Sequence, residues 1–234
     1  MIGTSGRARW STGPPTVLVV DDHELVRIAL VAALRAKDIP AYACACTTVR
    51  GILEEARAHP PGIALLDLDL GPGPDGAPVD GVEAVGPLRA NGWAVIVLTA
   101  CGGTREAYVA AAIAAGAIGQ VPKTASFDAL VEAVLRAVAG APLMSERERR
   151  EWIALDRHER AAAHRRTMLL SRLTARERAI LEQLADGHRA VDIAETSVVS
   201  VATVRSQIRS ILAKLEVTSQ LEAAAILRAH QSGR

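Results

Sequence analysis

VLVVDD at residues 17–22 and IALLDLD at residues 63–69 are the two stretches that decide the fold of this chain. In each stretch, a short run of apolar residues leads directly into aspartates. A continuous apolar run of this length is typical of a strand that is buried on both faces of a parallel sheet. Ligands of such sheets bind at the carboxyl ends of the strands. The aspartates therefore stand where a binding site is expected.

Around these two stretches, strand-like and helix-like segments alternate. The predicted strands are 16–20, 40–44, 63–66, 94–99 and 118–121. The predicted helices lie between and after them, at 24–37, 48–58, 81–90, 104–115 and 127–139. Repeated strand–helix units with short connections predict an α/β domain over residues 16–140, with helices on both faces of a parallel sheet.

The composition fits a compact protein with one or two cores. The chain has 234 residues, of which 50% are hydrophobic. Its cysteines, at 44, 46 and 101, are odd in number and lack framework spacing, which argues against a disulfide-built secreted protein. Residues 1–15 are expected to be a disordered lead without the apolar region of a signal peptide. No apolar run is long enough for a transmembrane helix, so we expect a cytoplasmic protein.

Charge is distributed unevenly along the chain. Residues 1–140 carry 11 Lys and Arg against 14 Asp and Glu, whereas residues 141–234 carry 16 against 12. The acidic N-terminal part suggests that it binds a cation, and the basic C-terminal part suggests that it binds a polyanion. Residues 141–170, dense in Arg, Glu and His, are expected to be a helical linker in solvent, with a helix that contacts a dimer partner or couples the domains as the alternative.

In the last segment, residues 171–234, the helix-capping and helix-terminating residues are spaced as in an all-α domain of four short helices. Thr174 and Glu177 have the spacing of a capping box, and Gly187 is a natural helix stop. Ser200 is placed to cap a helix that extends to about residue 215, and a further helix is predicted to open at Ser219.

Asp67 is the predicted phosphoacceptor, because its carboxylate ends a strand and faces the ligand edge of the sheet. Asp21, Asp22 and Asp69 gather beside it, and clustered carboxylates of this kind predict a Mg²⁺ site. Thr99 closes the fourth predicted strand and Lys123 follows the fifth. Their hydroxyl and ammonium groups are expected to bind phosphoryl oxygens.

The helix after Ser200 has one apolar and one polar face. Residues 204, 208, 211, 212 and 215 are apolar and recur at helical spacing, which indicates a buried face. Arg205, Ser206 and Arg209 fall on the opposite face, where a recognition helix meets base edges and phosphates in the major groove. Thr203, Gln207 and Lys214 are expected to contact phosphates of double-stranded DNA. An exposed polar helix face without a ligand is the alternative.

These motifs carry a resemblance to two families. The stretches around Asp21-Asp22, Leu66-Asp67 and Leu98-Thr99, together with the Gly-Gln-Val-Pro-Lys that ends at Lys123, resemble the receiver domain of two-component systems, which has a flavodoxin-like fold. The resemblance implies phosphorylation of Asp67 by a histidine kinase. It also implies Mg²⁺ held by Asp22, Asp67 and the backbone carbonyl of Asp69, with Asp21 reaching the ion through water.

Residues 171–229 resemble the LuxR-type helix-turn-helix of the NarL/FixJ response regulators. The matching motifs include LTARER from residue 173, LADG from 184 and SVATVR from 200. The resemblance implies a DNA-binding transcription factor that is not an enzyme and that acts as a homodimer when phosphorylated.

Two departures from the receiver pattern keep alternatives open. Gln120 stands where receivers usually carry an aromatic switch residue, and the loop after Asp67 is long, with Gly81 in the place that opens the third helix. We expect the inserted stretch 71–78 to be a solvent loop, with approach of Asp75 or Asp80 to the site as the alternative. These departures favour a second interpretation, a transcription factor that phosphorylation does not control. A remote third one is a haloacid-dehalogenase-like phosphatase using Asp67 and Asp69.

Overall fold

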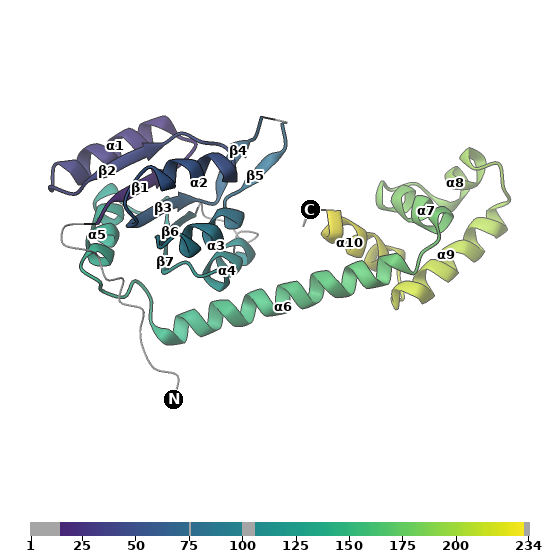
Figure 1. The fold of residues 1–234 in the computed structure, drawn as a ribbon. Helices are drawn as coiled ribbons and strands as arrows, with labels where there is room; N and C mark the ends of the chain where they lie inside the picture. The colour runs from purple at the N-terminus through teal and green to yellow at the C-terminus, as the bar shows by residue number, and fades with distance from the viewer. Residues whose placement is uncertain (1–14, 75, 100–105, 232–234) are drawn as a thin grey trace. The chain divides into compact units, whose positions relative to one another are not determined.

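The computed structural model describes residues 15–74, 76–99 and 106–231, and Figure 1 traces them. The chain divides into two compact units, Met1–Asp156 and Arg157–Arg234. Nearly all of the lead expected to be disordered, together with Asp75 and Cys101, lies outside the described residues. Cys44 is buried and Cys46 is half-buried beside the core of the first unit.

A parallel sheet forms the centre of the first unit. Within the described residues it has the strand order β2-β1-β3-β6-β7, and every neighbouring pair is parallel. The strands are β1 (Val17–Val20), β2 (Ala41–Cys44), β3 (Ile63–Asp67), β6 (Ala94–Thr99) and β7 (Gly119–Pro122). All residues of β1, β3 and β6 are buried, as their continuous apolar sequences predict. The predicted α/β sheet is therefore confirmed.

Helices cover both faces of this sheet (Figure 1). They are α1 (Glu24–Arg35), α2 (Val49–Arg57), α3 (Val82–Ala90), α4 (Glu106–Ala114) and α5 (Phe127–Val138). Side chains of α2, α3 and α4 pack on one face, in a cluster that contains Trp93. Those of α1 and α5 pack on the other, in a cluster that contains Leu34 and Val134. Ser126 caps α5 by accepting a hydrogen bond from the backbone N–H of Ala129, as predicted.

The stretch after Asp67 is a hairpin. The described residues of 71–78 are exposed or half-buried, as expected of a solvent loop, but residues 71, 72 and 78 at its ends belong to strands, which was not expected. β4 (Asp69–Pro72) pairs antiparallel with β5 (Pro78–Asp80), and the ladder begins at the pair Asp69 and Asp80. The cause is Leu70, which is buried in the sheet cluster and holds the start of β4 against the domain. The Asp80 carboxylate accepts a hydrogen bond from the backbone N–H of Val82, so it caps the entry to α3.

The second unit is helical throughout its described part. The elements are α6 (Glu146–Ser171), which begins in the first unit, then α7 (Ala175–Ala185), α8 (Ala190–Thr196), α9 (Val201–Leu215) and α10 (Gln220–Gln231). Apolar side chains from all of them form one cluster around Leu181 and Ile211. The capping box of Thr174 and Glu177 is present, and Gly187 follows α7 with a φ of 90°. The predicted helical linker and the four predicted short helices are confirmed.

Among the residues that the structure describes, no helix combines the length and apolarity that crossing a bilayer requires.

Candidate phosphoryl site and candidate DNA-binding helix

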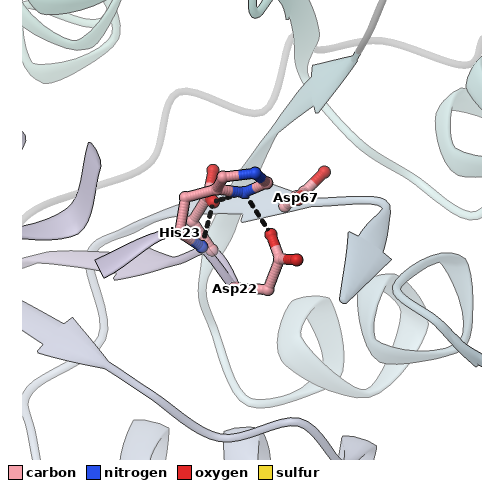
Figure 2. Close-up of side chains that lie close together, drawn as sticks. Asp22, His23 and Asp67 are labelled. Atoms are coloured by element: carbon pink, nitrogen blue, oxygen red, sulfur yellow. Dashed lines mark hydrogen bonds and ion pairs between the residues drawn. The ribbon is translucent and has the colours of Figure 1, made fainter. Parts of the chain in front are cut away.

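The carboxyl ends of β1 and β3 bring a group of acidic side chains together. Asp21, Asp22, His23 and Asp67 each offer one ligand atom, and these atoms lie within 4.8 Å of one another. Figure 2 shows Asp22, His23 and Asp67 side by side. Asp21 and Asp67 are 2% and 1% exposed, so their charges are removed from bulk water. Asp69 joins through its backbone, whose N–H donates to Asp67 Oδ1 at 3.1 Å.

Lys123 supplies a cation to this group from the end of β7. Its Nζ lies 2.5 Å from Asp67 Oδ2 and 3.0 Å from Asp21 Oδ2. Burial opposes its positive charge, but the hydrogen bonds to Asp67 and Asp21 outweigh burial and raise the pKa of Lys123. The Lys123 backbone N–H also donates to the carbonyl of Thr99 at 2.6 Å, which ties the ends of β7 and β6 together.

The burial of Asp67 disfavours the ionised form of its carboxyl group. Burial raises the pKa of Asp67 to about 6, although the hydrogen bond from Lys123 acts in the opposite direction. Among the described residues, three carboxylates of the group face one ammonium. The three carboxylates offer oxygen donors with an excess of negative charge, which is what Mg²⁺ prefers in proteins. The residues present therefore fit a divalent cation.

His23 is a member of the group that sequence reasoning missed. Its Nδ1 lies 2.5 Å from Asp22 Oδ1 and 3.1 Å from Asp21 Oδ1. Burial acts to raise the pKa of Asp22, but the hydrogen bond and the charge of His23 outweigh burial and lower it. The same hydrogen bond raises the pKa of His23. Its position directly after Asp22 was the available indication.

Thr99 and Gln120 form a contact that the sequence did not reveal. Thr99 is buried at the end of β6, and its hydroxyl donates to Gln120 Oε1 over 3.3 Å. In the ladder between β6 and β7, Gln120 pairs with Val97, two residues before Thr99. Alternation along a strand places residues two apart on the same face, and this puts the two side chains within reach.

Helix α9 presents the polar face that the sequence predicts for DNA binding. Ser200 caps the helix by accepting from the backbone N–H of Thr203. The apolar residues 204, 208, 211 and 215 are buried, whereas Arg205, Ser206 and Arg209 are exposed. Neither arginine forms an ion pair with another residue in the described part of the chain. Two free guanidinium groups one helical turn apart are suited to bind a polyanion.

The other predicted DNA contacts are placed differently. The Thr203 side chain is exposed, but its hydroxyl shares a hydrogen bond of 2.8 Å with that of Ser200. Gln207 is half-buried, with its Oε1 shielded from solvent. Lys214 Nζ lies 2.6 Å from Glu177 Oε2, so this ammonium holds the capping box of α7. DNA contacts by Gln207 and Lys214 stay predictions that their surroundings do not favour.

Comparison with known proteins matches both units to families. Residues 17–135 match the family model of the response regulator receiver domain, and residues 171–227 match that of the bacterial regulatory proteins of the luxR family. The described fold agrees with both matches.

Relatives of known identity align over nearly the whole chain. The nitrate/nitrite response regulator protein NarL of Escherichia coli K12 is 30% identical, over 90% of this chain and 94% of its own. The transcriptional regulatory protein LiaR of Bacillus subtilis is 31% identical, over 89% of this chain and 94% of its own. The solved RcsB response regulator of Salmonella typhimurium shares the fold, with 20% identity, a TM-score of 0.50 and coverage of 92% of this chain and 99% of its own. With its receiver sheet, its acidic group and its C-terminal helix-turn-helix, this chain belongs to the NarL/FixJ family of response regulators.

Proposed function

We propose that this response regulator is a transcription factor whose binding to double-stranded DNA is controlled by phosphoryl transfer from a histidine kinase to Asp67. One observation carries the proposal. A buried carboxylate at the end of β3 lies within reach of an ammonium and of two further carboxylates, which is the set of groups that an acyl phosphate needs.

The chemistry follows from the placement of these groups. A carboxylate oxygen of Asp67 attacks phosphorus, a P–O bond forms, and the P–N bond to the kinase imidazole breaks. Mg²⁺ would be held by Asp22, Asp67 and the carbonyl of Asp69, with Asp21 reaching it through water, and it would offset charge on the phosphoryl oxygens. Lys123 would exchange its bond to Asp67 Oδ2 for one to a phosphoryl oxygen.

Binding to DNA falls to the exposed face of α9. Arg205, Ser206 and Arg209 would enter the major groove, and Thr203 would contact the backbone. Phosphorylation would favour a homodimer that occupies paired half-sites, because coupling requires a surface that differs between the two states of the receiver.

The decisive experiment measures DNA affinity with and without beryllofluoride, an analogue of the phosphoryl group. We expect tighter binding for the wild-type chain and no response for Asp67→Asn. A wild-type chain that binds beryllofluoride but does not change its DNA affinity would contradict the proposal. That outcome would favour a transcription factor that phosphorylation does not control, the alternative that Gln120 raises.

A phosphatase function has less support in the structure. The acids that join Asp67 come from Asp21 and Asp22, upstream in the chain, whereas haloacid-dehalogenase-type enzymes take theirs from downstream positions. Hydrolysis of a generic phosphomonoester is therefore not expected.

A further inference from the structure

The hydrogen bond between Thr99 and Gln120 places a constraint on phosphoryl binding. The Thr99 hydroxyl carries a single proton, which it donates to Gln120 Oε1. The contact predicted between Thr99 and the phosphoryl group of Asp67 needs the same hydroxyl to donate to a phosphoryl oxygen. Because one proton cannot serve two acceptors, binding of the phosphoryl group must break the bond to Gln120 as it stands.

A glutamine side chain has a second arrangement available. Its amide carries both an acceptor oxygen and an NH₂ donor, so a turn of the amide plane brings Nε2 toward the Thr99 oxygen. Thr99 then accepts from Gln120 while it donates to the phosphoryl group. A half-buried Gln120 has the freedom for this turn, since its side chain is not fully enclosed.

We propose that Gln120 is a positioning residue, which holds the Thr99 hydroxyl away from the phosphoryl site and releases it by turning its amide when the site is occupied. This inference rests on the proposed function. It gives the chain a polar readout at the position where receivers usually turn an aromatic ring.

The neighbours of Gln120 connect it to helix α6. Gly119, directly before it, has no space for a side chain, because an added Cβ would lie 2.6 Å from Leu143 Cβ. Arg149, in the first turn of α6, donates to the carbonyls of Ala117 and Ile118 at 3.2 and 3.3 Å. Trp152 also packs against the sheet cluster. The segment 117–119 therefore connects Gln120 with the start of α6.

The test compares Gln120→Glu with Gln120→Leu, by titration of each full-length chain with beryllofluoride in Mg²⁺. A carboxylate accepts from Thr99 but cannot donate to it afterwards, so we expect Gln120→Glu to lower the affinity about tenfold, the effect of one lost hydrogen bond. Leucine leaves Thr99 free, so Gln120→Leu should bind at least as tightly as the wild type.

A Thr99→Val background separates this mechanism from simple repulsion between the new carboxylate and the anion. Repulsion persists without the hydroxyl, whereas the part of the penalty that passes through Thr99 disappears. We therefore expect the gap in affinity between the Gln120→Glu and Gln120→Leu chains to shrink markedly when both substitutions are combined with Thr99→Val. An equal gap in both backgrounds would overturn the inference.

Hydrogen exchange of residues 141–155 gives an independent readout. Beryllofluoride should change exchange of this segment in the wild type and leave it unchanged in Gln120→Leu, a result that also decides the matter if Gln120→Glu does not fold. An equal response in both chains contradicts the inference. A wild-type chain that binds no beryllofluoride overturns the proposed function as well, whereas normal binding with no difference between variants overturns only the role of Gln120.

Discussion

The two units of this protein differ in where their charged side chains lie and how these are paired. In the first unit Asp21 and Asp67 are buried, and among described residues these two and Asp22 share the ammonium of Lys123. In the second unit the buried carboxylate of Glu177 is paired with a cation of its own unit, the ammonium of Lys214. The arginines of α9 are left to face solvent. The acidic group of the first unit therefore has more negative than positive charge and suits a cation. The exposed arginines of the second unit instead suit a polyanion.

The largest effect should come from removing the buried carboxylate that we propose as the phosphoacceptor. Asp67→Asn should abolish acid-labile phosphorylation by acetyl phosphate, because an amide is not a nucleophile toward phosphorus. Asp69→Asn is the matched control and should still be labelled, since the contribution expected of Asp69 comes from its backbone. Equal labelling of Asp67→Asn and the wild type would show that the acceptor is another residue.

The outward charges should affect DNA binding and nothing in the receiver. Arg209→Ala should weaken binding to an operator by about 1–3 kcal/mol if the guanidinium makes a bidentate base contact. Arg228→Ala removes an exposed arginine from a different helix, α10, and should change affinity much less. Footprinting and titration at fixed salt measure both, and an unchanged footprint for Arg209→Ala would refute its role.

The internal pairing of the second unit should appear as acid sensitivity. The hydrogen bond from Lys214, followed by that from the Thr174 backbone, lowers the pKa of Glu177 to about 2. A folded-state pKa below the unfolded value of 4.5 means that this stabilisation is complete above pH 4.5 and is lost as the pH falls toward 2. Glu177→Gln should lower the free energy of unfolding by about 2 kcal/mol near pH 7. It should also weaken the pH dependence of stability between pH 4.5 and 2.

Urea unfolding of the full chain, followed by hydrogen exchange in α7 and α9, measures the loss at Glu177. Glu182→Gln changes the same residue type on the exposed side of α7 and should have little effect. Equal losses for the two variants would mean that the pair with Lys214 adds no stability.

A smaller effect is expected where the backbone of the second unit is strained. Val198 lies between α8 and α9 with a φ of 52° and is 90% exposed. A β-branched residue in the left-handed region lowers the free energy of unfolding by about 1 kcal/mol. Val198→Gly removes this strain, so we expect it to raise the free energy of unfolding by part of that amount. Val191→Gly in helical α8 should instead destabilise the chain, so thermal shifts of the same sign would contradict this explanation.

The sequence predicted the elements of both units well because each has a local indication. The strand 94–99 was predicted with the bounds it has in the structure, and Ser126, Thr174 and Ser200 were identified as caps. Apolar runs and capping residues act within a few positions along the chain, so their consequences can be derived without the tertiary structure.

The missed features depend on contacts between distant segments. The hairpin β4–β5 has the Gly and Pro content of a loop, and its anchor, the buried side chain of Leu70, becomes visible only in the tertiary structure. The bond from Thr99 to Gln120 spans 21 positions and follows from the register of β6 and β7. Lys214 was predicted to face DNA, because a charge pattern cannot show that Glu177 lies beside it.

The hairpin also has a practical consequence. Its strands pair only with each other in the described sheets, so residues added between Pro72 and Pro78 would lengthen it without moving β3 or β6. The hairpin is close to the acidic group, since a Cβ added at Gly71 would lie 3.5 Å from Asp22 Oδ2. A fluorophore or epitope grafted into the outer turn would therefore be a tolerated label, carried by a hairpin that begins beside the acidic group.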